Sequence, residues 1–161
     1  MKELQKGRSM IEMLGVLAII GVLSIGGLAG YTMAMNRHRA NQILDYVSRC
    51  AVAAQTKGDG YVIAGGSAST DTCGNLLPLE TAPNGLAKAS FKVWGADASS
   101  QHFIITTPTI KSQDIRTALL NRDNTNVTIR EGDGAANGAM PTENTSTAGS
   151  ETAKISFQFK K

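Results

Sequence analysis

Residues that commonly build catalytic and metal sites are scarce in this chain. Its 161 residues include two histidines, His38 and His102, and two cysteines, and their spacing matches no metal site. A glycine-rich phosphate loop ending in lysine is also missing. We expect His38 to be solvated and His102 to lie at a strand end. The sequence therefore predicts a protein that is not an enzyme, with no catalytic residues, no cofactor and no bound metal.

Aromatic residues are few, at 5% of the chain, and the formal net charge is only +3. Surfaces that bind nucleic acid usually gather basic residues into a stripe with aromatic residues between them. Here the basic residues are scattered along the chain, among them Arg37, Arg39, Arg49, Arg116, Arg122, Arg130, Lys160 and Lys161. We therefore expect no dedicated nucleic-acid site.

Charge is missing altogether from residues 13–35, which are mostly apolar. At about 1.5 Å per residue, a helix of this length can cross a hydrocarbon core of roughly 30 Å. The stretch can be an uncleaved single-pass anchor or a cleaved secretory signal, and the length of its apolar run favours the anchor. Basic residues stand on both sides of it and leave its orientation open.

One acid, Glu12, stands directly before this uncharged stretch. An ionisable side chain costs about 2.5 to 3.5 kcal/mol at the centre of a bilayer and less near the interface, so it usually has a charged partner. Arg8 lies four residues earlier and can pair with Glu12 on one helix face. The other candidate partner is a free amino group produced by proteolysis nearby.

The residues around Glu12 belong to a wider pattern. A short basic leader ends in Gly7, the residues RSMIE follow, and the apolar helix comes next, with Ala18, Ile19, Gly21, Leu23 and Tyr31 further along. This pattern resembles the class III signal of type IV pilins and pseudopilins. The resemblance implies that prepilin peptidase cleaves after Gly7 and that Arg8 becomes the first residue. It also implies that Glu12 meets the N-terminal amine of a neighbouring subunit in a filament.

Two positions depart from that family's pattern. Arg8 replaces the usual phenylalanine or methionine at the new N-terminus, where the family's N-methylation would fall. Ala29 stands where many pilins have a helix-bending proline, so any bend would depend on glycines, which weaken helices by roughly 1 kcal/mol each.

The helix is expected to continue beyond the uncharged stretch and to become amphipathic. Apolar residues recur there at helical spacing, as Ala40, Ile43, Leu44, Val47, Cys50, Ala51 and Ala54. Lys57 followed by Gly58 is a typical helix end. The apolar stripe of this second half needs another element to cover it.

An antiparallel sheet is the expected cover. Residues 154–160 alternate strictly, with Ile155, Phe157 and Phe159 on one face, and shorter alternations occur in SFKVW, HFIITT and NVTIRE. Ser112 can begin a short helix that runs to about Asn121, with Ile115, Leu119 and Leu120 facing inward. The run FIITTPTIKSQDIRTALL is also loosely similar to the globular part of type IVb pilins.

Two segments are predicted to be loops: residues 58–88, rich in Gly, Ser, Thr and Asn, and residues 132–150, with little apolar content.

Cys50 and Cys73 can form a disulfide if the helix leads into an oxidising compartment. Two buried thiols are the alternative.

A group of polar residues between 123 and 133 could form a calcium site, although a polar turn is the favoured interpretation. Its oxygen ligands would be Asp123, Asn124, Asn126, Glu131 and Asp133.

The sequence thus predicts an α+β protein whose long N-terminal helix, membrane-spanning in its first half, packs on a small antiparallel sheet. Residues 1–7 would be a leader, residues 8–35 a membrane and filament-core helix, and residues 36–161 a soluble domain. The resemblance implies a structural subunit of a bacterial type IV pilus or pseudopilus. Its partners would be prepilin peptidase, the pilus assembly machinery and other copies of itself. Its locations would be the inner membrane before assembly, and an extracellular pilus or periplasmic pseudopilus afterwards. The alternative is a single-pass binding protein held by an uncleaved anchor.

Overall fold

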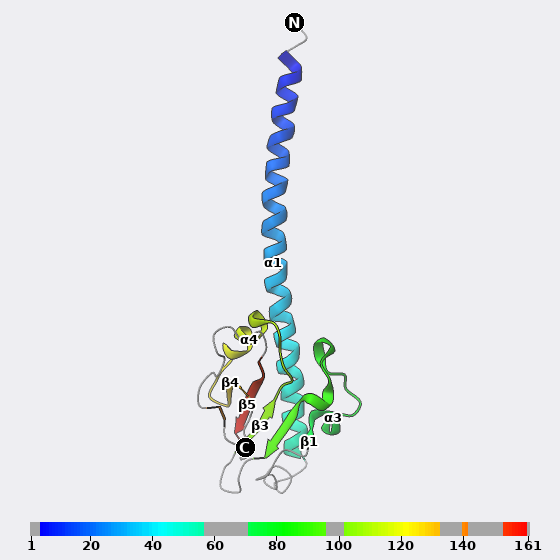
Figure 1. Cartoon of the computed structure of the whole chain (residues 1–161), viewed down its shortest axis with the longest axis vertical. Helices are drawn as coiled ribbons and strands as arrows, with labels where there is room; N and C mark the ends of the chain where they lie inside the picture. The colour runs from blue at the N-terminus through cyan, green and yellow to red at the C-terminus, as the bar shows by residue number, and fades with distance from the viewer. Residues whose placement is uncertain (1–3, 57–70, 96–101, 133–139, 142–152, 161) are drawn as a thin grey trace. The chain divides into compact units, whose positions relative to one another are not determined.

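The structure is a computed structural model that describes residues 4–56, 71–95, 102–132, 140–141 and 153–160. The chain divides into two compact units, Met1–Met35 and Asn36–Lys161. Helix α1 (Leu4–Thr56) is continuous and contributes residues to both units (Figure 1). It ends one residue before the expected Lys57–Gly58 stop.

In the first unit, α1 is not amphipathic. Every side chain described from Met10 to Ala34 is exposed. Helix α1 contains a stretch that is long and apolar enough to cross a membrane, as the sequence predicts.

The second unit contains a five-stranded antiparallel sheet in the order β1-β2-β3-β5-β4. Its strands are β1 (Asp71–Thr72), β2 (Lys92–Gly95), β3 (His102–Thr106), β4 (Val127–Glu131) and β5 (Ile155–Lys160). The last strand of the chain therefore lies between β3 and β4 and pairs with both. The predicted strands and the α+β class are confirmed.

The core of this unit lies between the sheet and the second half of α1. Along α1 the buried residues are Ala40, Ile43, Tyr46, Val47, Cys50, Ala51 and Ala54. Leu44, predicted to be buried, is only half-buried against the core. On the sheet, Ile105 of β3 and Ile129 of β4 both pair with Phe157, and all three side chains are buried. The apolar residues of the predicted alternation in β5, Ile155, Phe157 and Phe159, therefore face the core.

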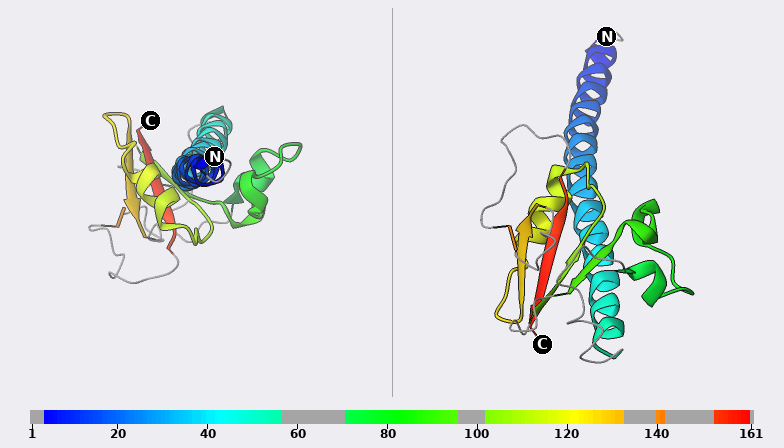
Figure 2. Two further views of the ribbon diagram at one scale, coloured as in Figure 1. Left: turned by 90° about the horizontal axis from the view of Figure 1, so that it is seen from above. Right: turned by 60° about the horizontal axis from the view of Figure 1, so that its bottom comes forward.

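A second layer of short helices lies on the other side of this half of α1 (Figure 2). It contains α3 (Cys73–Leu76) and the 3₁₀ turns η1 (Pro83–Gly85) and η2 (Lys88–Ser90). The prediction of one loop over residues 58–88 was therefore wrong for residues 71–76, 83–85 and 88, holds for residues 77–82 and 86–87, and falls outside the described chain for residues 58–70. Cys73, Leu76 and Phe91 are buried, and this burial orders a segment whose composition is typical of a loop.

Helix α4 (Gln113–Leu120) confirms the predicted short helix, with Ser112 in the N-cap position. Ser112 makes no side-chain cap hydrogen bond. Ile115 and Leu119 are buried as expected, whereas Leu120 is half-buried. Arg116 is also buried, which the sequence analysis did not anticipate.

Candidate functional site

The residues that the pilin-like pattern singles out lie in the first unit. Gly7, Arg8 and Glu12 all belong to α1. Glu12 is exposed, and no hydrogen bond or ion pair joins it to any side chain that the structure describes. The side chain of Arg8 lies outside the described residues, so an Arg8–Glu12 pair stays a prediction.

Around Glu12, α1 presents a continuous apolar surface. Its large apolar side chains are between 54% and 75% exposed. They are Met10, Ile11, Met13, Leu14, Val16, Leu17, Ile19, Ile20, Val22, Leu23, Ile25, Leu28, Tyr31 and Met33. A helix that is apolar on all sides is normally covered by lipid or by other protein. This surface therefore requires a cover that the described chain does not supply.

Three hydroxyl groups lie on this apolar surface, those of Ser24, Tyr31 and Thr32, and the serine and threonine hydroxyls are bonded within the helix. The Ser24 hydroxyl donates to the Ile20 carbonyl oxygen at 2.7 Å, and the Thr32 hydroxyl donates to the Ala29 carbonyl oxygen at 2.9 Å. A hydrogen-bonding group without a partner costs several kcal/mol in hydrocarbon, so internal bonds of this kind suit a dry environment. Ser48 and Thr56 make the same kind of bond in the second half of α1, so these bonds are compatible with a dry environment but do not distinguish it from water.

Cys50 of α1 and Cys73 at the start of α3 form a disulfide. Both residues are fully buried, and the structure thus selects the first of the two alternatives left open by the sequence. The 23-residue separation corresponds to about 3 kcal/mol in the chain-entropy model. The bond holds the α3 segment against the second half of α1.

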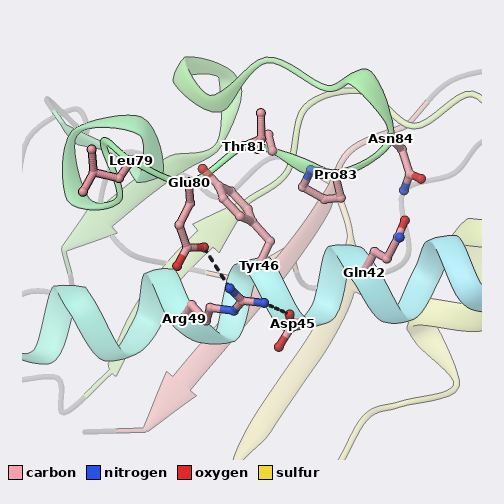
Figure 3. Close-up of a pocket in the computed structure, with 10 residues that line it drawn as sticks. Gln42, Asp45, Tyr46, Arg49, Leu79, Glu80, Thr81, Pro83 and Asn84 are labelled. Carbon is pink, nitrogen blue, oxygen red and sulfur yellow. Dashed lines mark hydrogen bonds and ion pairs between the residues drawn. The ribbon is translucent and has the colours of Figure 1, made fainter.

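A surface pocket of about 490 Å³ lies between that half of α1 and the segment after α3. We call it the Arg49 pocket. Figure 3 shows Arg49 between two acids: it makes an ion pair with Asp45 one turn earlier, and its Nη1 lies 3.3 Å from Oε2 of Glu80. The hydrogen bond with Asp45 and the charges of both acids raise the pKa of Arg49. One positive and two negative charges leave this pocket with a formal charge of −1.

Tyr46 lines the same pocket but is almost completely buried, with 3% of its surface exposed. Its ring packs edge-on against Phe91 at 5.0 Å between centroids. Its hydroxyl has no hydrogen-bond partner among the residues that the structure describes. Burial, and secondarily the negative charge of Glu80, raises the pKa of Tyr46 above 10.0. The sequence analysis missed Tyr46, although its spacing from Ile43 and Cys50 places it on the buried stripe.

Glu131 and Arg116 form a buried ion pair, with Arg116 Nε 3.0 Å from Glu131 Oε1. Arg116 Nη1 also donates to the Ile110 carbonyl oxygen at 2.8 Å. The pair thus joins α4, the connection before it and the end of β4. A signal was present in the sequence, because alternation along β4 places Glu131 on the same face as Ile129.

The candidate calcium ligands do not converge. Asp123 accepts from Arg130 and from the Ile129 backbone N–H, Asn124 accepts from the backbone of its own turn, and Glu131 pairs with Arg116. Asp133 lies outside the described residues. Within the described chain, no three His, Cys, Asp or Glu side chains are grouped as metal ligands would be. The polar-turn interpretation therefore holds for Asp123 and Asn124.

Neither histidine lies near the candidate calcium ligands in the sequence. His38 is exposed, with its Nε2 3.1 Å from Gln42 Nε2, and His102 is the first residue of β3. Comparison with family models, with curated proteins and with solved structures gives no match. A function is therefore inferred from the residues and their geometry.

Proposed function

We propose that this protein is a structural subunit of a bacterial type IV pilus or related pseudopilus. In this proposal prepilin peptidase removes residues 1–7, and the mature subunit begins at Arg8. The single observation that carries the proposal is the uncovered apolar surface of α1, with one exposed acid, Glu12, at its start, five residues after Gly7.

The apolar surface supports two successive environments. Before assembly the inner membrane covers it, since the uncharged stretch is long enough to cross the hydrocarbon core. In a filament, the same surface packs against the helices of other copies. Fully burying one large apolar side chain is worth about 1.5 to 3 kcal/mol relative to water, so several such contacts can hold a subunit in a polymer outside the membrane.

In this mechanism Glu12 sets the axial position of one subunit relative to its neighbour. Cleavage after Gly7 creates an amino group at Arg8, and Glu12 of one subunit accepts the amine of its neighbour. An unmatched charge in a dry helical core costs several kcal/mol, so the pair disfavours every stagger that separates the two groups. Apolar packing then provides most of the affinity, and the pair selects the axial position.

The leading competitor is a single-pass anchor that is never cleaved. It is supported by the position of Arg8, which lies one helical turn before Glu12 and can neutralise it locally. In that case α1 stays in the membrane and the second unit acts alone as a binding domain.

The mature N-terminus separates the two proposals. Mass spectrometry of the chain from cells with a working prepilin peptidase should find a product that starts at Arg8, methylated or not. Replacement of Gly7 by a bulky residue should leave the full-length precursor in the membrane. An intact Met1 in the unmodified chain would favour the anchor.

Assembly is tested with Glu12→Ala and the matched variant Glu3→Ala, which changes an acid within the leader. Both variants should be made and processed. Sheared surface fractions or pseudopilus preparations should contain at least about tenfold less polymer for Glu12→Ala, because several kcal/mol are lost per subunit. Glu3→Ala should match the parent. Normal polymer from Glu12→Ala would end the proposed mechanism.

A further inference from the structure

The second unit has another pocket, with a volume of about 630 Å³, between α1, the η1 turn and the start of α4. We call it the Arg39 pocket. Its lining includes Arg39, Ile43, Ile110, Lys111, Ser112 and Ile115. A hydrogen bond joins the η1 side of this pocket to α1: Asn84 Nδ2 donates to the Arg39 carbonyl oxygen at 3.2 Å.

Two positive charges face this pocket without a counter-charge. Arg39 and Lys111 are exposed, and neither forms an ion pair with any acid in the described part of the chain. The acid nearest to Lys111 in the sequence is Asp114, and its Oδ2 accepts from Asn36 Nδ2 at 3.0 Å. A guanidinium and an ammonium group on one cavity favour an anion, and the planar guanidinium suits a phosphate in particular.

The rest of the lining is mixed: Asn84, Thr109 and Ser112 are polar, and Ile43, Leu86, Ile110 and Ile115 are apolar. Ile43, Ile110 and Ile115 are buried and form part of the cavity wall. A small inorganic anion would leave this apolar wall unused. The combination instead fits a ligand that joins a phosphate to a hydrocarbon portion.

The position of Arg39 in the chain indicates where such a ligand is found. Arg39 follows the uncharged stretch by four residues on the same helix, which corresponds to about 6 Å of rise. The headgroup layer on each side of a bilayer is about 5 to 8 Å thick. When residues 13–35 span the hydrocarbon core, Arg39 therefore lies at the depth of the lipid phosphates.

We propose that the Arg39 pocket binds the phosphate headgroup of an anionic phospholipid while the subunit resides in the membrane. Arg39 and Lys111 contact the phosphate, the Ser112 hydroxyl is available to donate to it, and the isoleucines contact the upper part of the lipid. Basic pockets between membrane helices on the cytoplasmic or matrix side bind anionic headgroups by the same attraction. The inference rests on the membrane-resident state in the proposed function, but not on filament assembly.

The test uses the full chain, purified in a non-ionic detergent and examined by native mass spectrometry with added phosphatidylglycerol or phosphatidylcholine. One phosphatidylglycerol should be retained in preference to phosphatidylcholine. Each cation near an anionic headgroup contributes about a fivefold gain in affinity, so Arg39→Gln with Lys111→Gln should lower the preference by about twenty-five-fold. Trp94, the single tryptophan, reports by its fluorescence that the variant is folded.

The matched control is Arg37→Gln with Lys92→Gln, which removes the same charge from two cations that do not line the pocket. It should keep the preference for phosphatidylglycerol. An equal loss in the control would show attraction to net charge alone and would overturn the proposal. Equal retention of the two lipids by the parent chain would also overturn it.

A third arm separates a lipid from a soluble phosphate. Glycerol 3-phosphate at low millimolar concentration should not displace the bound phosphatidylglycerol; complete displacement would assign the pocket to a soluble phosphate and overturn the lipid proposal. Glu12→Ala should leave the lipid preference unchanged. Failure of filament assembly and failure of lipid binding are therefore distinguishable.

Discussion

The two halves of α1 carry apolar residues in different patterns and meet different surroundings. Before Met35, apolar residues occupy every side of the helix, and Val22 is 72% exposed. After Asn36 they form one stripe, and Val47 on that stripe is fully buried. The first pattern needs a cover that the described residues do not supply, whereas the second is covered by the sheet and the α3 segment. One continuous helix thus carries a stripe that belongs to the core and an apolar surface that the described residues leave uncovered.

The largest expected effect comes from placing the same charge in each half. Val47→Asp should abolish cooperative unfolding of the second unit, because an unpaired buried charge costs several kcal/mol against a typical total of about 5 to 15 kcal/mol. Urea unfolding of the detergent-solubilised chain, followed by Trp94 fluorescence, measures this.

Val22→Asp is the matched variant for this comparison. It should leave the Trp94 transition within about 0.5 kcal/mol of the parent, because exposed positions contribute little to the fold. It should instead reduce membrane insertion, by about 2.5 to 3.5 kcal/mol on the insertion scale. A similar loss of folding in both variants would contradict the division of α1 into two roles.

A smaller effect is expected for the buried ion pair of the second unit. Arg116→Ala should lower the free energy of unfolding by about 3 to 5 kcal/mol, because it leaves the Glu131 carboxylate buried without its main partner. Arg130→Ala removes the more exposed Arg130–Asp123 pair, joined at 2.9 Å, and should cost at most about 1 kcal/mol. Chemical denaturation of both variants gives the difference. Equal losses would mean that burial of the Arg116–Glu131 pair does not matter.

The smallest effect is expected at Tyr46, and it has the opposite sign. A buried hydroxyl without a partner carries a desolvation cost of about 1 to 3 kcal/mol, so Tyr46→Phe should stabilise the second unit by about 1 kcal/mol at pH 7. Tyr31→Phe changes an exposed tyrosine in the first half of α1 and should have no effect on the unfolding of the second unit. Loss of stability in Tyr46→Phe would indicate that the hydroxyl has a partner.

The same variant has a pH signature. Burial raises the pKa of Tyr46 in the folded state, so the unfolded chain ionises first. The free energy of unfolding that the chain has with a neutral Tyr46 is fully present below pH 10.0. It falls as the pH rises from 10.0 through the raised pKa. The parent should therefore lose stability in that range more steeply than Tyr46→Phe. Parallel curves would contradict the assigned burial.

Alternation was sufficient to predict the strands β2 to β5, and helical spacing together with the end signals Ser112 and Lys57–Gly58 predicted α4 and the approximate end of α1. The segment 71–88 could not be recognised from composition, because its order comes from contacts of Cys73 and Leu76 with residues far away in the sequence. Of the candidate site residues, Glu12 was identified from its neighbours alone. The Arg39 pocket was not, because Arg39 and Lys111 are 72 positions apart and only folding brings them to one cavity.

The sequence by itself determined where α1 is apolar on all sides and where it is amphipathic, and which residues of β5 face the core. These are local properties, since the periods of a helix and a strand decide which side chains share a face. Tertiary structure alone decided that β5 lies between β3 and β4, that Cys50 meets Cys73, and that Arg116 meets Glu131. Each of these contacts joins segments distant in the chain, and it forms only when the sheet and α1 enclose a common core.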